Sequence, residues 1–106
     1  QKGLSIDTTN VPLMVDMASV CLAENYRIKE DDPGKAERVL HTADLLLGRA
    51  VKLEPGNARA GAKLAVSRLW KGECADAWAW YRSSHSRDPL VVEEGFLETL
   101  RRHCPE

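Results

Sequence analysis

Apolar side chains recur every three or four residues over most of this chain, which is the spacing of an amphipathic helix. The clearest run covers residues 33–53. Its apolar face comprises Val39, Leu40, Ala43, Leu46, Leu47, Ala50 and Leu53. A strand would alternate apolar and polar side chains, and no stretch of the sequence does so. The pattern therefore predicts an all-α protein of about five helices.

The ends of these helices are marked by residues that cap or stop a helix. Asn10, Asp32 and Asn57 each precede an apolar run and can accept a hydrogen bond from its first amides. The predicted helices run from residue 10 to about 28, over 33–53, 58–71 and 74–85, and from the Asp88–Pro89 pair to about 103. The links between them are so short that neighbouring helices must be antiparallel.

Four pairs of residues are separated by the same interval of 34 positions. They are Ala43 and Ala77, Leu47 and Tyr81, Ala50 and Ser84, and Pro55 and Pro89. Each copy has a small residue, a large one, another small one and then a proline that stops the helix. A fixed interval of this length indicates a helical repeat array, in which small residues lie where two helices cross closely.

The spacing Ala-x3-large-x2-small-x4-Pro resembles the second helix of the tetratricopeptide repeat (TPR) family. The resemblance covers residues 11–104 and implies antiparallel hairpins stacked as a short TPR-like solenoid. It divides the chain into a flexible N-terminal arm (1–9), an irregular repeat (10–57), a repeat (58–91) and a capping helix (92–104). Both helices of the irregular repeat exceed the period, so we expect the first hairpin to protrude beyond the second by more than a turn.

The first-helix half of the family pattern becomes Gly61-x2-Leu64-Ala65-x2-Arg68 in this chain. Gly61 and Arg68 depart from the residues that the family places there. Because Gly61 lacks bulk, we expect Trp70 or Trp80 to fill the space beside it.

The binding surface of such arrays is the groove lined by their first helices. Here the resemblance implies that the partner-binding residues include Arg59, Ala62, Lys63, Val66 and Trp70. Arg59 and Lys63 are four positions apart and lie on one helix face, and some TPR domains hold a peptide's terminal carboxylate with such a basic pair. The alternative interpretation is an ordinary charged face in contact with solvent.

The two tryptophans of the fourth helix point in different directions. Trp78 and Trp80 are two positions apart on a helix and cannot both point inward. We expect one of them to be partly exposed or to face a partner, and Trp78 is included in the predicted partner-binding set on this basis.

The chain has three cysteines, and none forms a CxxC pair. In a TPR-like stack the ends of helices three and five meet at one edge, which implies a disulfide between Cys74 and Cys104. Cys21 would then be a buried free thiol. The alternative is three reduced cysteines in a cytoplasmic protein. A disulfide would favour an oxidising location, either periplasmic or secreted.

Charge and composition disfavour several classes of function. The formal net charge of −1 provides no overall basic surface for nucleic acid. No apolar stretch is long enough to span a membrane. The histidines lie on different helices without a nucleophile at a useful spacing, so we expect neither an enzyme nor a metal or other cofactor.

The sequence thus predicts a module for protein–protein interaction that binds a peptide or a partner helix in its concave groove. The alternative is a structural accessory subunit of a larger cell-envelope assembly, without a discrete ligand. In either case the partner is a protein, and a homodimer is consistent with the pattern.

Overall fold

The computed structural model describes residues 10–93 and 95–106. It contains five α-helices: α1 (Val11–Ile28), α2 (Pro33–Leu53), α3 (Ala58–Trp70), α4 (Cys74–Arg87) and α5 (Phe96–His103). A short 3-10 helix, η1 (Pro89–Val91), follows α4. No strand occurs in these residues. The all-α prediction is confirmed, whereas the predicted arm at 1–9 lies outside the described residues.

Local hydrogen bonds explain where the first three helices begin. The side chains of Asn10, Asp32 and Asn57 each accept a hydrogen bond from the backbone amide three residues later, at 3.0, 3.1 and 2.9 Å respectively. Each bond satisfies an amide that the helix itself leaves without a partner. These capping residues are the ones that the sequence indicated.

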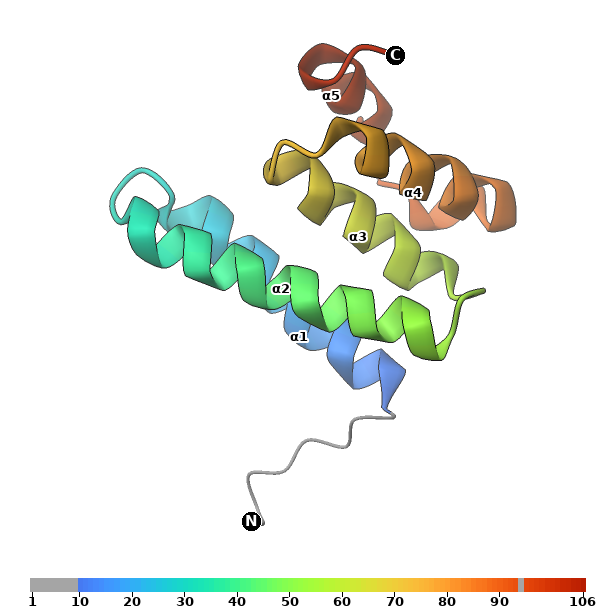
Figure 1. Cartoon of the computed structure of the whole chain (residues 1–106), viewed down its shortest axis with the longest axis horizontal. Helices are drawn as coiled ribbons and strands as arrows, with labels where there is room; N and C mark the ends of the chain where they lie inside the picture. The colour runs from blue at the N-terminus through green and yellow to red at the C-terminus, as the bar shows by residue number, and fades with distance from the viewer. Residues whose placement is uncertain (1–9, 94) are drawn as a thin grey trace.

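The helices form two antiparallel hairpins, α1–α2 and α3–α4, which stack side by side with α3 against α2 (Figure 1). The principal extents of the molecule are 46 × 36 × 20 Å. The chain therefore forms a flat, stacked helical array, as the 34-residue interval predicted.

Two apolar clusters hold the array together. The larger joins α1, α2 and the first half of α3, and its fully buried members include Met14, Leu47 and Leu64. The smaller lies at the C-terminal end and consists of Leu69, Ala77, Trp78, Leu100 and Cys104. The partly buried Tyr81 and Phe96 pack against this second cluster.

The two hairpins differ in length, as expected. α1 and α2 have 18 and 21 residues, whereas α3 and α4 have 13 and 14. At 1.5 Å per residue, α2 exceeds α3 by about 12 Å. The loop end of the α1–α2 hairpin consequently extends beyond the end of α3 (Figure 1). This offset creates a step along the side of the molecule.

The helices α3 and α4 cross closely at Gly61. A Cβ atom at this position would collide with the side-chain oxygen of Ser84 and lie 3.4 Å from the ring of Trp80. The expectation that a tryptophan fills this space is therefore confirmed for Trp80. Trp70 lies elsewhere, at the opposite end of α3.

The prediction of one continuous helix after the Asp88–Pro89 pair, and of a capping helix over 92–104, was wrong in extent. Asp88 does cap a turn, by accepting a hydrogen bond from the amide of Leu90 at 3.1 Å, but only the 3-10 turn η1 follows. The backbone then breaks at Gly95, whose φ of +88° favours glycine. This break redirects the chain so that Phe96 and Leu100 pack against α4 and the second cluster.

Candidate functional site

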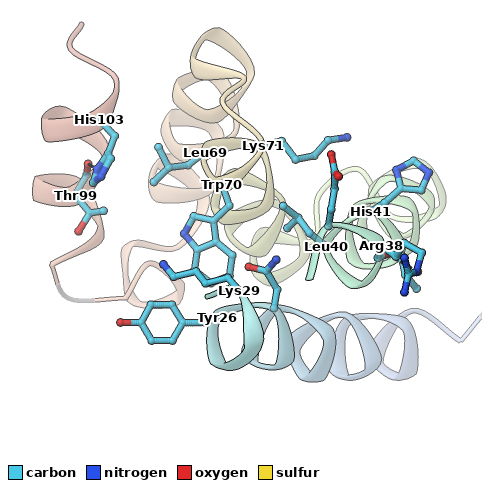
Figure 2. Close-up of a pocket in the computed structure, with 13 residues that line it drawn as sticks. Tyr26, Lys29, Arg38, Leu40, His41, Leu69, Trp70, Lys71, Thr99 and His103 are labelled. Atoms are coloured by element: carbon cyan, nitrogen blue, oxygen red, sulfur yellow. Dashed lines mark hydrogen bonds between the residues drawn. The ribbon is translucent and has the colours of Figure 1, made fainter. Parts of the chain in front are cut away.

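A cleft of about 1110 Å³ occupies the step between the two hairpins (Figure 2). One wall is the protruding end of the first hairpin, which contributes Tyr26 from α1, Lys29 from the turn that follows α1, and Arg38 and His41 from α2. The other wall is the end of α3, with Trp70, together with residues of α5. The length difference between the hairpins is therefore what opens the cleft.

Two aromatic rings meet across this cleft. The centroids of Tyr26 and Trp70 are 6.1 Å apart, with their planes inclined at 30°. The ammonium group of Lys29 lies 4.6 Å from the centroid of the Tyr26 ring. Tyr26 is 64% exposed and Trp70 is 38% exposed, so both retain much of their surface in contact with solvent. Figure 2 shows the Tyr26 ring close below the Trp70 ring, at one side of the group of lining residues.

The charged side chains in the cleft lining are mostly cationic. Of the residues that the structure describes, Lys29, Arg38 and Lys71 line it together with one carboxylate, that of Glu37. Lys71 is engaged, because its ammonium lies 3.3 Å from a carboxylate oxygen of Asp44. Within residues 10–93 and 95–106, Lys29 and Arg38 have no carboxylate within 4 Å.

A buried ionic network fastens the two hairpins together behind the cleft. The carboxylate of Asp44 on α2 accepts hydrogen bonds from Ser67 at 2.7 Å and from the Nε of Arg68 at 2.8 Å. Arg68 also donates to Asp76 at 2.8 Å, which links α4 to the same network. The residue at which the family pattern fails, Arg68, is thus the centre of the inter-helix contacts.

The network shifts the pKa values of Asp44 and Arg68. Burial tends to raise the pKa of Asp44, but the hydrogen bonds from Ser67 and Arg68 and the charges of Arg68 and Lys71 outweigh it, so the pKa lies below its ordinary value. Burial likewise opposes the charge of Arg68, yet Asp44 and its other acidic neighbours leave the pKa of Arg68 raised. Both groups are therefore held in their charged forms.

The predicted groove residues do not form one open surface. Arg59 pairs with Asp16 of α1 at 2.7 Å, and Lys63 lies 3.5 Å from Glu93. Ala62 is buried, and with Val66 it lines a cavity of only about 10 Å³. Side chains that follow α4 close this cavity, namely Val91, Val92 and Phe96. Trp70 alone among the predicted groove residues lines the large cleft.

Trp78 and Trp80 pack against different parts of the core. Trp78 is only 6% exposed, and its indole N–H donates to the backbone carbonyl of Cys104. Trp80 is half-buried against the larger cluster. Trp78, placed in the partner-binding set from the sequence, therefore has little surface to offer a partner. A spacing of two positions allowed both rings to be covered because the array has two separate clusters.

Cys74 and Cys104, predicted to pair, bring their sulfur atoms to disulfide-bonding distance at 2.05 Å, with 5.3 Å between their Cα atoms. This link ties the end of α5 to the start of α4. Two residues of α5, Thr99 and His103, line the cleft, so the disulfide also secures that wall. Cys21 carries a free thiol and is half-buried, and burial together with nearby Glu24 raises its pKa.

Two further features concern the part of the chain that the structure describes. No group of three or more His, Cys, Asp or Glu side chains in it is arranged to hold a metal ion. None of its helices combines the length and the apolar character needed to cross a membrane. The candidate site is the cleft between the hairpins, which is lined by aromatic rings and charged side chains.

Comparisons with protein-family models, with curated proteins and with solved structures found no match for this chain.

Sequence reasoning placed Trp70 in the site but missed Tyr26, Lys29, Arg38 and His41. Tyr26, Lys29 and Arg38 lie at the loop end of the first hairpin, where α2 begins earlier than the 34-residue period requires, whereas His41 corresponds to Ala75 within α4. The excess length of the first hairpin was therefore a signal that could have located the cleft. A longer hairpin packed against a shorter one leaves part of its surface without a neighbouring helix.

Proposed function

We propose that this protein is an interaction module that binds a segment of a partner protein in the cleft between its two hairpins. The observation that carries the proposal is the exposed pair of Tyr26 and Trp70, held 6.1 Å apart within the cleft. Exposed tyrosine and tryptophan are the side chains that most often anchor protein–protein contacts.

The size of the cleft supports a peptide segment as the occupant. A helix about 10 Å across, rising 1.5 Å per residue, occupies roughly 120 Å³ per residue. The cleft volume of about 1110 Å³ therefore corresponds to about nine helical residues. It exceeds the few hundred cubic ångströms that suffice for many small ligands.

The proposed binding surface, the cleft between the two hairpins, differs from the groove of first helices that the TPR resemblance implies. The 34-residue interval and the stacked hairpins support kinship with that family. However, Ala62 and Val66 are covered by the segment after α4, whereas the cleft is open. The pairing of Cys74 with Cys104 supports an oxidising location for the module, periplasmic or secreted.

Selection from a random peptide library tests the proposal. Peptides of about twelve residues, slightly longer than the cleft, are selected on the immobilised protein. We expect the selected peptides to lose at least tenfold in affinity against the Tyr26→Ala/Trp70→Ala variant, since anchors of this kind contribute more than about 1.4 kcal/mol. Failure to select any peptide, or binding unaffected by this variant, would contradict the proposal.

Leu45→Ala provides the matched control for this experiment. Leu45 lies on α2, as Arg38 and His41 do, and is 60% exposed, but it does not line the cleft. Peptide affinity should stay within about twofold of the wild type in this variant.

A second candidate is the structural subunit of a larger assembly. Leu13 and Val20 are seven positions apart on α1, which places both on one helix face, and they are 40% and 69% exposed. A partner subunit or a second copy that covers this face would bury them. Sedimentation of the purified protein tests this candidate, because self-association should disappear in Leu13→Lys/Val20→Lys.

A further inference from the structure

The charges that line the cleft differ from those of the whole chain. The protein has a formal net charge of −1, yet among residues 10–93 and 95–106 lysine and arginine outnumber carboxylates in the cleft lining, where Glu37 is the one carboxylate. A cleft that is more positive than the surrounding surface attracts negatively charged groups. The excess of cationic side chains in the cleft therefore indicates that the bound ligand carries negative charge.

Two of these cations are available to a ligand. The charge of Lys71 is neutralised in part by Asp44 and Glu73, at 3.3 and 3.8 Å. Lys29 and Arg38 have no such partner among residues 10–93 and 95–106. Lys29 lies in the turn after α1 and Arg38 lies on α2, both on the protruding wall of the cleft (Figure 2).

One of the two available cations, Lys29, lies beside the exposed aromatic pair, whereas Arg38 lies apart from it on α2 (Figure 2). The ammonium of Lys29 is 4.6 Å from the Tyr26 centroid, and Tyr26 in turn packs on Trp70. Guanidinium and ammonium groups bind carboxylates, whereas the ring faces accept apolar or aromatic side chains. A ligand that uses both must carry a carboxylate within a few residues of an apolar side chain.

From this juxtaposition we infer that the cleft binds an acidic peptide segment, with its carboxylates at Lys29 and Arg38 and an apolar side chain against Tyr26 and Trp70. The inference rests on the proposed function and specifies the chemistry of the partner. A nucleic acid fits less well, because it gains affinity from many phosphate contacts and this cleft offers two available cations on a chain of net negative charge.

The composition of the peptides selected from the random library tests the inference. We expect enrichment in Asp and Glu, together with at least one aromatic or aliphatic residue. Affinity of these peptides should fall several-fold when the salt concentration rises from about 0.1 M to about 1 M, because the screening length shortens from ~10 Å to ~3 Å.

Paired charge variants make the test specific to the cleft. Lys29→Gln/Arg38→Gln should weaken the selected peptides by roughly three- to tenfold, the sum expected for two solvent-exposed ion pairs. The control is Arg49→Gln/Lys52→Gln, which removes two exposed cations from the C-terminal half of α2, away from the cleft lining. Its effect should stay within about twofold. Thermal unfolding of both variants checks that they are folded.

The outcomes separate the inference from the proposed function. Neutral or basic peptides that bind, and lose affinity in Tyr26→Ala/Trp70→Ala, would overturn the acidic ligand and leave the cleft as the binding site. Equal losses in the two charge variants would also overturn it, because the effect would then come from overall charge. Peptides whose affinity is unchanged in Tyr26→Ala/Trp70→Ala would overturn both proposals.

Discussion

The first hairpin and the last helix are attached to the array by different means. α1 and α2 share most of a cluster of twelve buried residues, and their side chains at the centre are fully covered. α5 has eight residues, of which Leu100 alone is buried within the helix, and its end is tied to α4 by the Cys74–Cys104 pair. A long amphipathic helix can rely on apolar contacts, whereas a helix of two turns needs a covalent link.

This difference matters for the candidate site because the cleft has one wall of each kind. The wall formed by Tyr26, Lys29 and Arg38 belongs to the hairpin with the extensive core. Thr99 and His103 belong to α5, whose position depends on the cross-link. We therefore expect the two walls to respond differently to substitutions, and the following experiments compare them.

The largest effect is expected from Leu47→Ala in the core of the first hairpin. Leu47 is fully buried, so truncation removes apolar contacts and leaves a cavity, at a cost of about 4 kcal/mol in the free energy of unfolding. Urea denaturation measures the change. Leu45→Ala is the matched control, because Leu45 is 60% exposed and should cost less than about 1 kcal/mol. Similar losses in both variants would contradict the central role of this core.

Removal of the cross-link should act on the other wall. Cys74→Ser/Cys104→Ser releases a loop of 30 residues, which in the chain-entropy model costs about 3.6 kcal/mol. Amide hydrogen exchange should accelerate most in α5, because the variant retains only non-covalent contacts of α5 with the array, chiefly the burial of Leu100 and the hydrogen bond from Trp78 to the carbonyl of residue 104. The control is Cys21→Ser, which leaves the pair intact. Equal acceleration in α2 and α5 would show that the two regions do not differ.

A smaller effect is expected where the two hairpins join. Asp44→Asn weakens the hydrogen bonds from Ser67 and Arg68, and we expect a loss of about 2 kcal/mol. Because the folded state lowers the pKa of Asp44, its contribution is complete above about pH 4 and is lost as the pH falls through the folded-state value. The difference between variant and wild type should therefore shrink at about pH 3.

Urea denaturation at about pH 7 and about pH 3 measures this dependence. Asp76→Asn is the control, because Asp76 also binds Arg68 but its side chain is 54% exposed, which leaves the pair largely screened by water. A constant difference across this pH range would contradict the assigned ionic role of Asp44.

The smallest effect is expected at the crossing of α3 and α4. Gly61→Ala places a methyl group against the hydroxyl of Ser84 and should cost about 1 to 2 kcal/mol, despite the better helix propensity of alanine. The double variant Gly61→Ala/Ser84→Ala removes the collision and should recover most of that loss. Thermal unfolding of the two single variants and the double variant measures the coupling, and additive effects would contradict the close approach.

Much of the fold was predictable because the signals are local. Asn10, Asp32 and Asn57 cap helices through bonds to amides three residues away, and apolar spacing along a helix does not depend on distant residues. The break at Gly95 was missed because the Asp88–Pro89 signal starts a turn whether or not a helix continues. Whether a helix continues after this turn depends on the tertiary contacts of Phe96 and Leu100, which the local sequence does not specify.

The candidate site was predictable only in part. Trp70 was identified from its helix, but its partner Tyr26 lies 44 positions earlier, and no local pattern connects the two. The groove around Ala62 and Val66 was predicted to be open, yet the segment after α4 folds over it. Which surface is open thus depends on contacts between segments far apart in the chain.

The amino-acid sequence by itself determined the helices, most of their ends, the repeat interval and the unequal lengths of the hairpins, because hydrogen bonding and apolar periodicity act over a few residues. The tertiary structure alone decided that Trp78 is buried, that the expected groove is covered and that Tyr26 meets Trp70 across an open cleft. These features depend on how helices cross and on which side chains compete for the same space, and a one-dimensional pattern does not encode either directly.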